Sequence, residues 1–338
     1  MVAGAEARAG ARGARGRASA RPDHIAWLHH GEPATRWGNL GLWPAGSQEP
    51  AQASYAAACT ALATAVGEAA GMQPADVVLS LACGGGEELA LWAERFGAAA
   101  VIGVESSPSL AAQARRRVEA AHASCVFDVH CADARQLPQL VHARFNRIVC
   151  VDALYHLGAR MPLLRAAKAR LYGGGSIAFT DLVLDGRPAP AWRRIALRVG
   201  AGLAGITHAE PRSEAATLAQ LREAGFIDVR ARRLDEAVLA GFCRFAQAQG
   251  RRIGATARAS AGWRRVAMTA WLIRAGLEAG LGYALYSGRV SAEPGAAPEP
   301  DPAGARAQPP ARPAAATRAA ATSAERTALS SRGMPGCA

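Results

Sequence analysis

A glycine-rich bend is the first feature of this sequence that could do chemistry. Residues 77–88 read VVLSLACGGGEE, an apolar run that leads into three glycines and two glutamates. A phosphate-binding P-loop would need a lysine in the bend, and this stretch has none. The dinucleotide fingerprint G-x-G-x-x-G matches Gly84 and Gly86 but meets Leu89 at its third glycine. Glu105, about twenty residues further on, could hold the ribose hydroxyls of any adenosine cofactor and does not discriminate among them.

The surrounding sequence predicts the elements that position this bend. Apolar runs indicate strands at 77–82, 98–105, 124–130, 146–153 and 176–184. Helical spacing is found at 51–70, 87–96, 108–122 and 160–171. Such alternation, with strands apolar on both faces, predicts a parallel sheet covered by helices on both sides. Further on we expect a basic amphipathic piece at 187–213, a helix at 214–224, a strand in FIDVRARRLD, a long helical stretch ending near 278 and a last strand at 281–288.

Five segments, in order and at ordinary spacing, resemble the class I S-adenosylmethionine-dependent methyltransferases: VVLSLACGGG, VIGVESSPSL, CADARQLP, FNRIVCVDALYHL and LYGGGSIAFTDLVL. NLGLWP at 39–44 resembles an N-terminal segment of some of these enzymes. The resemblance covers residues 37–290 and is strongest to the small-molecule branch, which includes ubiquinone-biosynthesis, tocopherol and sugar O-methyltransferases. It implies an α/β fold with a Rossmann-like, doubly wound, seven-stranded sheet in which the last strand is antiparallel.

The resemblance also implies a cofactor site. Glu105, with Ser106 beside it, would accept hydrogen bonds from both ribose hydroxyls. Asp133 would take the adenine amino group. The other residues implied around S-adenosylmethionine are Ala82, Cys83, Gly84 and Gly86 in the bend, Ala134 beside Asp133, and Asp152 and Ala153 on the methionyl side.

Two residues of the bend depart from the family pattern. Ser80 stands where an aspartate is usual, and Ala82 replaces a glycine. Losing a carboxylate near a cationic amino group should weaken cofactor binding, or shift that role to backbone carbonyls and Asp152.

Two polar residues are expected beyond the carboxyl ends of the strands, where open parallel sheets bind ligands. His156 follows the fourth strand, and Asp181 ends the fifth. A hydroxyl acceptor must lose its proton during methyl transfer, so we assign His156 as general base and Asp181 as its orienter or a second acceptor contact. The resembled sugar O-methyltransferases carry similar residues at both places. The alternatives are a backbone hydrogen bond for His156 and a turn cap for Asp181.

The acceptor pocket is expected to be walled by Trp43, Tyr155 and Trp192, although each tryptophan could equally belong to the core. Arg193, Arg194 and Arg198 form a basic helix face. This face could invite an anionic or membrane-associated substrate, but a solvated surface is the favoured account.

Composition limits the other possibilities. The chain has 338 residues and a net charge of +12, yet it lacks the basic–aromatic interleaving of a nucleic-acid-binding surface. Its seven cysteines occur singly, without zinc spacing, which favours a reduced cytoplasmic compartment and no metal. We find no signal peptide and no stretch of about 20 uncharged apolar residues.

Low-complexity composition sets the domain boundaries. Residues 1–22 are rich in Gly, Ala and Arg, and residues 291–338 in Pro, Ala and Arg, so both are expected to be disordered tails. Residues 23–290 would form the methyltransferase domain, with helical insertions at 187–213 and 236–278 on the acceptor side.

The sequence thus predicts a monomeric or homodimeric enzyme that methylates a small organic acceptor, with oxygen favoured as the acceptor atom. The alternatives are methylation of carbon or nitrogen, cyclopropane-type addition to a lipid, and a non-catalytic protein that binds S-adenosylmethionine, which Ser80 would favour. Acceptor identity is not encoded in these motifs, because such pockets are built from variable loops.

Overall fold

The computed structural model of the chain describes residues 37–44, 55–120, 125–137, 143–158, 160–185, 191–203, 206 and 212–292. The predicted tail at 1–22 lies outside these residues, as does all but the beginning of the predicted tail at 291–338. The boundaries assigned to the domain and its insertions stay predictions.

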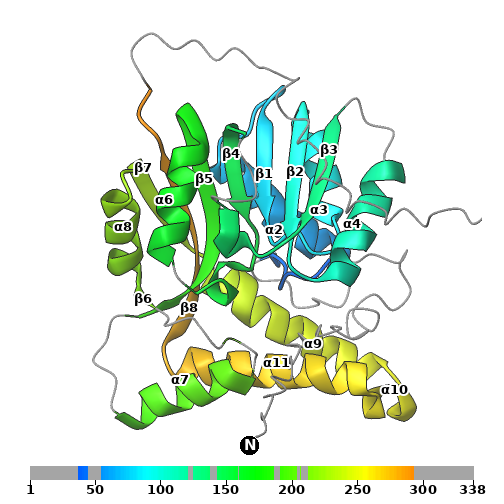
Figure 1. The fold of residues 1–338 in the computed structure, drawn as a ribbon. Coiled ribbons are helices and arrows are strands. Elements are labelled where there is room, and N and C mark those ends of the chain that lie inside the picture. Colours follow the sequence, from blue (N-terminus) through cyan, green and yellow to red (C-terminus); the bar gives the residue numbers. More distant parts are fainter. Residues whose placement is uncertain are drawn as a thin grey trace, which may run out of the picture. The chain divides into compact units, whose positions relative to one another are not determined.

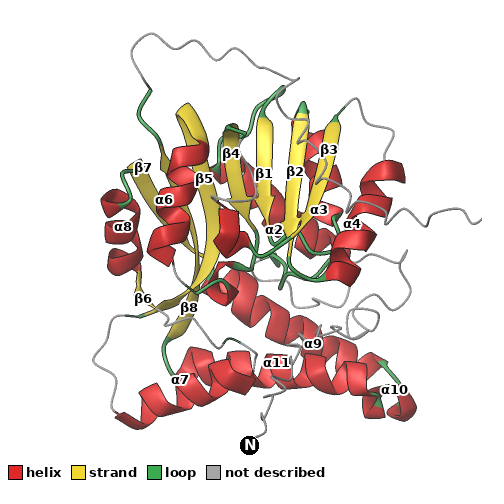
Figure 2. Ribbon diagram, viewed as in Figure 1, coloured by secondary structure: helices red, strands yellow, loops and turns green. Residues whose placement is uncertain are grey.

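The described strands form one eight-stranded sheet, shown in yellow in Figure 2. Neighbours along it are β3 (Val126–Cys131), β2 (Ala100–Glu105), β1 (Val77–Leu81), β4 (Phe145–Cys150), β5 (Leu171–Leu184), β8 (Leu281–Arg289) and β7 (Ile227–Arg233), while the short β6 (Arg212–Ser213) also pairs with β5. Strands β1 to β5 are mutually parallel, whereas β8 lies antiparallel between β5 and β7. The predicted doubly wound sheet with an antiparallel last strand is confirmed.

Strand β5 begins earlier than the sequence pattern predicts. It starts at Leu171, at the beginning of the glycine-rich LYGGG segment that precedes the predicted strand at 176–184. Gly174 has φ +77°, a left-handed conformation that favours glycine, and the pairing with β4 changes register between Phe145 and Arg147. The glycines therefore form an irregular start to the strand.

Helices cover both faces of the sheet (Figure 1). Helices α2 (Tyr55–Ala69), α3 (Glu87–Phe96) and α4 (Pro108–Ala120) share one buried core with the sheet. Helices α6 (Arg160–Arg170) and α8 (Glu214–Glu223) share the other. Successive residues of β1 point to opposite faces, so Val78 belongs to the first core and Leu79 to the second. Burial on both faces explains why the parallel strands are apolar throughout.

A further helical layer crosses the carboxyl end of the parallel strands, at the bottom of Figure 1. It contains α7 (Ala191–Leu203), a π-helical turn (Asp235–Ala240), α9 (Gly241–Arg252), α10 (Ala255–Ala259) and α11 (Ala261–Glu278). Because Leu281 of β8 pairs with Leu184 at the end of β5, the preceding α11 lies at this carboxyl end. The long helical stretch predicted to reach 278 is thus interrupted, and Ser260 caps α11 by accepting from the Trp263 N–H. Within the described residues, no helix combines the length and apolar character needed to cross a bilayer.

Candidate active site

The bend between β1 and α3 needs its glycines for different reasons. Gly86 has φ +84°, and a Cβ there would lie 2.8 Å from the Ala114 Cα of α4, so close packing excludes a side chain. Gly84 has φ +56°, and a Cβ built on it would meet no atom within 4 Å. Cys83 turns inward, with its Sγ against Gly103 of β2. The open side of Gly84 is therefore where a ligand can approach the backbone.

Ala82 begins this bend in a left-handed conformation, with φ +57°. That conformation costs an L-residue about 1 kcal/mol relative to glycine, because the Cβ crowds the next carbonyl. The glycine usual at this position would avoid the cost. The bend thus keeps the left-handed conformation at this position although the residue there is alanine.

The Glu105 carboxylate lies against the open bend. It ends β2, is 7% exposed, and its Oε2 accepts a hydrogen bond from the Gly84 N–H at 2.9 Å. Its Oε1 accepts from the Ser107 N–H at 2.8 Å and lies 3.5 Å from the exposed Ser106 hydroxyl. These contacts place a fixed negative group beside an uncovered glycine backbone, as a ribose site requires. The Glu105 carboxylate and the open backbone at Gly84 therefore fit an adenosyl cofactor.

Asp133 lies one strand further along the same edge. The Ala132 N–H donates to the Glu105 carbonyl at 2.9 Å, which brings the segment after β3 beside the end of β2. The Asp133 side chain caps a 3-10 turn through the Arg135 N–H and also forms an ion pair with the Arg135 guanidinium. Hydrogen bonds from Arg135 lower the pKa of Asp133. Its neighbour Ala134 is buried. The predicted contact of Asp133 with adenine therefore competes with Arg135.

A second glutamate, which sequence analysis did not single out, lies beneath the bend. Ser80 is fully buried in β1, and its hydroxyl donates to Glu88 Oε1 in the first turn of α3. The Trp92 indole N–H donates to the same hydroxyl at 3.3 Å. Glu88 is 6% exposed, and burial, reinforced by Glu105, raises its pKa to about 8 in spite of the Ser80 hydrogen bond. A carboxylate from α3 thus reaches the place that the family fills from β1.

Asp152 joins three parts of the chain. Its Oδ2 accepts from the Leu40 N–H at 2.7 Å, and its Oδ1 accepts from the hydroxyls of Tyr155 at 2.8 Å and Tyr283 at 2.6 Å. Its own N–H donates to the Thr180 hydroxyl at 2.7 Å, and its φ is +52°. Asp152 therefore fastens segment 37–44 to the ends of β4 and β5, with the half-buried Ala153 next to it. Its predicted place on the methionyl side stays a prediction.

His156 ends a 3-10 turn, Leu154–His156, directly after β4. Its ring is half-buried and lies 4.5 Å from the Tyr155 ring, centroid to centroid. The Tyr155 ring itself is 8% exposed, and its hydroxyl is bound to Asp152. His156 thus lies at the edge of the sheet expected for the base, while Tyr155 is held mainly in the interior.

Asp181 faces α6 from β5 and is fully buried. Its carboxylate forms an ion pair with Arg160, the first residue of α6, and accepts from the Leu182 N–H at 2.8 Å. Burial raises the pKa of Asp181 to about 7, although Arg160 opposes the rise. These contacts tie α6 to the sheet. The orienting role assigned to Asp181 stays a prediction, because its contacts among the described residues are with Arg160 and Leu182.

The predicted pocket walls differ in how they are placed. Trp43 is 2% exposed and stacks on Phe245 of α9 with ring centroids 4.5 Å apart, so it belongs to the core between α9 and α2. Its indole N–H donates to the Leu40 carbonyl at 2.9 Å. The side chain of Trp192 lies outside the described part of the chain. Acceptor contacts by these residues stay predictions.

Comparison with known sequences identifies the class of the central region. Residues 78–175 match the family model described as a methyltransferase domain. The curated erythromycin 3''-O-methyltransferase of Saccharopolyspora erythraea is 30% identical over 212 residues, which are 60% of this chain and 65% of that protein. The match therefore spans a little under two thirds of the relative's length.

Solved structures share the fold at lower identity. The cyclopropane synthase MmaA2 from Mycobacterium tuberculosis has a TM-score of 0.63 at 16% identity, covering 80% of this chain and 94% of that one. The [4+2]-cyclase SpnF has a TM-score of 0.59 at 20% identity, with the same coverage of 80% and 94%. A methyltransferase from Geobacter sulfurreducens in complex with S-adenosylhomocysteine has a TM-score of 0.53 at 18% identity, covering 79% and 97%.

Residues 78–175 therefore carry a methyltransferase domain, as the sequence motifs predict. The likeness to the O-methyltransferase agrees with those motifs, and the solved structures share the fold. S-adenosylmethionine is the cofactor of this family.

Proposed function

We propose that this protein transfers a methyl group from S-adenosylmethionine to a hydroxyl oxygen of a small organic acceptor. The observation that carries the proposal is the Glu105 carboxylate, which is fixed against the open backbone of Gly84 at the end of the sheet. The preference for oxygen is supported by the likeness to a curated O-methyltransferase. Acceptor identity is left to experiment.

In this proposal the chain's own residues hold the cofactor. Glu105 and Ser106 bind the ribose, Asp133 and Ala134 lie along the adenine, and Asp152 and Ala153 border the methionyl end. The cofactor lies against the backbone of the bend, at Ala82, Cys83, Gly84 and Gly86. When bound, the cofactor supplies an electrophilic methyl group on a sulfonium. The protein's contribution is to hold the acceptor oxygen in line with that group and to exclude water.

Glu88 takes the role of the acid that Ser80 replaces. Its carboxyl group hydrogen-bonds to the Ser80 hydroxyl, so an acidic group from α3 lies beside this position of β1, and it becomes negatively charged as the pH rises toward its pKa of about 8. In its ionised form Glu88 attracts the cationic part of the cofactor. The departure at Ser80 is then a substitution compensated within the fold, and it no longer favours a protein that binds without catalysis.

His156 accepts the proton that the acceptor hydroxyl loses as its oxygen bonds to the methyl carbon and the carbon–sulfur bond breaks. Its half-buried position just beyond β4 is the geometric support for this role. Asp181 acts on this end of the sheet through Arg160, as a positioning residue for the start of α6.

The test is a turnover assay with methyl-labelled S-adenosylmethionine and a pool of hydroxylated metabolites. We expect label in an acid-stable ether product, identified by mass, and S-adenosylhomocysteine in equal amount. The matched variants are Glu105→Ala, which should lower turnover at limiting S-adenosylmethionine through weakened cofactor binding, and Glu119→Ala on the exposed side of α4, which should leave turnover unchanged. Label found only on nitrogen or carbon, or an olefin gaining a methylene bridge, would reject the oxygen assignment.

A further inference from the structure

Helices α7 and α11 present large apolar side chains to solvent. Ile195 and Val199 of α7 are 61% and 57% exposed, and Met268 and Trp271 of α11 are 50% and 60% exposed. They are four of the six exposed large hydrophobic residues in the described part of the chain. We call these four residues the α7–α11 face. Such side chains are normally buried, so their grouping calls for a partner.

The two helices lie together. A Cβ built on Gly200 of α7 would lie 3.7 Å from Leu272 of α11, which is ordinary contact distance. Along α11, Met268 and Trp271 are separated by three residues and therefore lie on one side of the helix. Val199 follows Ile195 by four residues and shares a side of α7 in the same way. Each helix thus contributes an apolar stripe.

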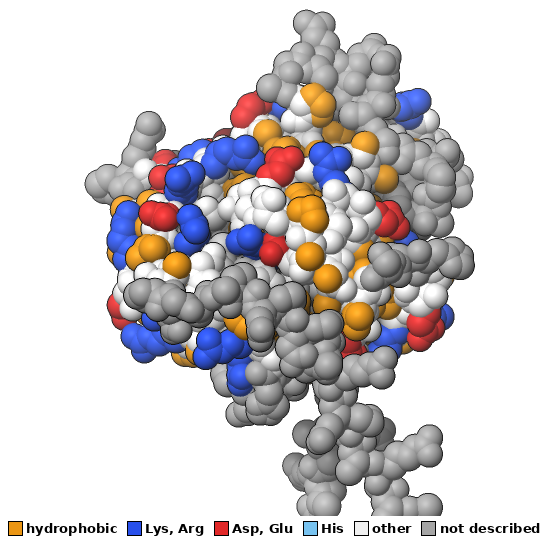
Figure 3. Space-filling model, turned by 90° about the horizontal axis from the view of Figure 1, so that it is seen from above, with side chains coloured by type: hydrophobic (Ala, Val, Ile, Leu, Met, Phe, Trp, Pro, Cys, Tyr) orange, Lys and Arg blue, Asp and Glu red, His pale blue; other side chains and the backbone are white. Residues whose placement is uncertain are grey.

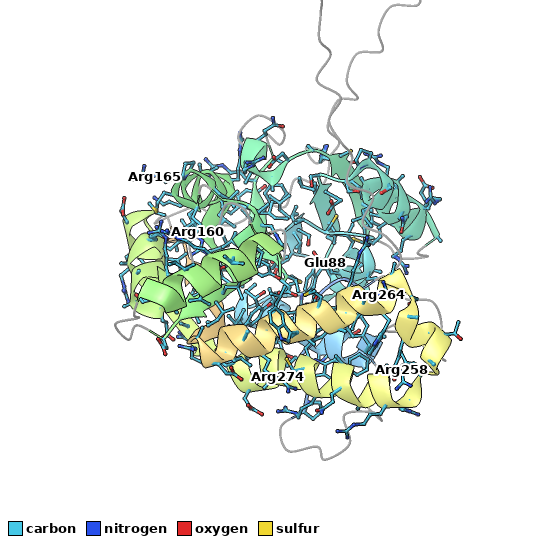
Figure 4. All side chains as sticks on the ribbon, turned by 90° about the horizontal axis from the view of Figure 1, so that it is seen from below. Glu88, Arg160, Arg165, Arg258, Arg264 and Arg274 are labelled. Atoms are coloured by element: carbon cyan, nitrogen blue, oxygen red, sulfur yellow. The ribbon has the colours of Figure 1, made fainter. Side chains whose placement is uncertain are left out.

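The same layer concentrates the positive charge of the molecule. With its π-helical turn, this layer contains ten arginines and three acidic residues, Asp235, Glu236 and Glu278, a balance of +7 in a chain whose net charge is +12. Arg264 and Arg265 precede the apolar stripe of α11, and Arg274 follows it; all three are exposed. Figure 4 looks onto this layer from below and labels Arg258, Arg264 and Arg274 along α10 and α11.

The opposite end of the molecule is different. Figure 3, seen from above, shows Asp and Glu side chains among the arginines, with hydrophobic side chains scattered between them. The basic excess is therefore a local property of the helical layer and not only a consequence of an arginine-rich composition.

We propose that the α7–α11 face docks on the surface of an anionic lipid membrane. Exposed Trp, Ile, Val and Met side chains flanked by arginines are the pattern of helices that lie in a bilayer interface: the apolar side chains enter the acyl boundary and the guanidinium groups bind anionic headgroups. A second copy of the chain fits this face poorly, because a symmetric contact would bring the exposed arginines beside it, Arg264, Arg265 and Arg274, toward the same arginines of the other copy. Nucleic acid would satisfy the charge but not the aliphatic side chains.

The position of the α7–α11 face in the fold relates it to the proposed active site. The layer crosses the carboxyl end of the sheet, where the proposed cofactor and acceptor sites lie. Docking there would bring the acceptor side of the enzyme to the bilayer and so favour amphipathic or lipid-dissolved acceptors. The docking proposal does not depend on the methyl-transfer proposal, since it rests on the outer surface alone.

The experiment is sedimentation of the full chain with vesicles of phosphatidylcholine containing phosphatidylglycerol, at low and at high salt. We expect binding that falls steeply with salt and is much weaker to pure phosphatidylcholine. The double variant Arg264→Glu/Arg265→Glu should bind at least about tenfold more weakly, because each basic residue contributes measurably at an anionic surface. Trp271→Ser should weaken binding by several-fold at every salt concentration.

The control variants change the same kinds of side chain, arginine and exposed apolar residues, outside the helical layer. Arg116→Glu/Arg222→Glu alters the net charge equally on α4 and α8, and Ile227→Ser removes an exposed apolar side chain from β7. Both should bind vesicles as the wild type does. If both double arginine variants lost vesicle binding equally, net charge alone would explain the effect, and the proposal would be overturned. So would self-association of the wild type without vesicles that Trp271→Ser abolishes, since the face would then join two copies.

Discussion

Replacing Glu88 by glutamine tests the buried carboxylate beneath the bend. Burial raises the pKa of Glu88 from an ordinary value of 4.5 to about 8. Between these two values the unfolded chain has released the proton while the folded protein still holds it. The folded state is therefore penalised progressively as the pH rises toward 8, and the stability contributed by the protonated group is fully present only below about pH 4.5. Glutamine keeps the shape, can still accept from Ser80, and does not titrate.

The size of the effect follows from the pKa shift. One pKa unit corresponds to about 1.4 kcal/mol, and across pH 6 to pH 8 the Glu88 contribution to the free energy of unfolding falls by about 2 kcal/mol. Asp181, whose pKa is raised to about 7, acts in the same direction in both proteins. The informative quantity is thus the difference between wild type and variant, which should change by about 2 kcal/mol in favour of Glu88→Gln over this range.

Urea unfolding at pH 6, 7 and 8, followed by circular dichroism, measures this difference. Glu119→Gln, an exposed carboxylate on α4, is the control and should run parallel to the wild type. Parallel curves for Glu88→Gln and wild type would show that Glu88 titrates like an exposed carboxylate, and the reasoning would fail. Calorimetry adds a second readout: affinity for S-adenosylmethionine should rise between pH 7 and pH 9 in the wild type and be flat in the variant.

Three further predictions concern single residues. His156→Ala should lower kcat by about 10² while leaving the affinity for S-adenosylmethionine unchanged, measured by steady-state kinetics and calorimetry; near-normal turnover would reject the base. Ala82→Gly should raise the free energy of unfolding by about 1 kcal/mol, because it relieves a left-handed alanine, whereas Ala93→Gly inside α3 should lower it by a similar amount. Asp152→Ala should cost about 3 kcal/mol or more in denaturant unfolding, because it removes the buried acceptor that three donors share.

The parts of this molecule that sequence could predict are those with local signals. Alternating apolar strands and helices predicted the sheet, because a strand buried on both faces must be apolar throughout. The bend was visible because Gly84 and Gly86 lie where backbone conformation and close packing demand glycine. Glu105 was predicted because it ends the second strand, 21 residues after Gly84 of the bend.

What sequence could not predict depends on contacts between distant residues. Glu88 was visible as one of two glutamates after the glycines, but the 3.6-residue period alone does not reveal that its side chain turns back to Ser80. The hub at Asp152 joins Leu40 and Tyr283, 112 and 131 residues away, and neither pairing leaves a pattern in the chain. The Asp181–Arg160 ion pair likewise depends on how α6 packs on the sheet, and no pattern in the sequence indicates it.

Calorimetric titration of the protein with S-adenosylmethionine, alongside Glu105→Ala and Glu119→Ala, tests the central claim most directly. The account predicts one bound cofactor per chain, an affinity at least about tenfold weaker in Glu105→Ala because a charge-assisted pair of hydrogen bonds to ribose is lost, and no change in Glu119→Ala. Wild-type affinity retained in a folded Glu105→Ala protein, or no binding by the wild type, would contradict it.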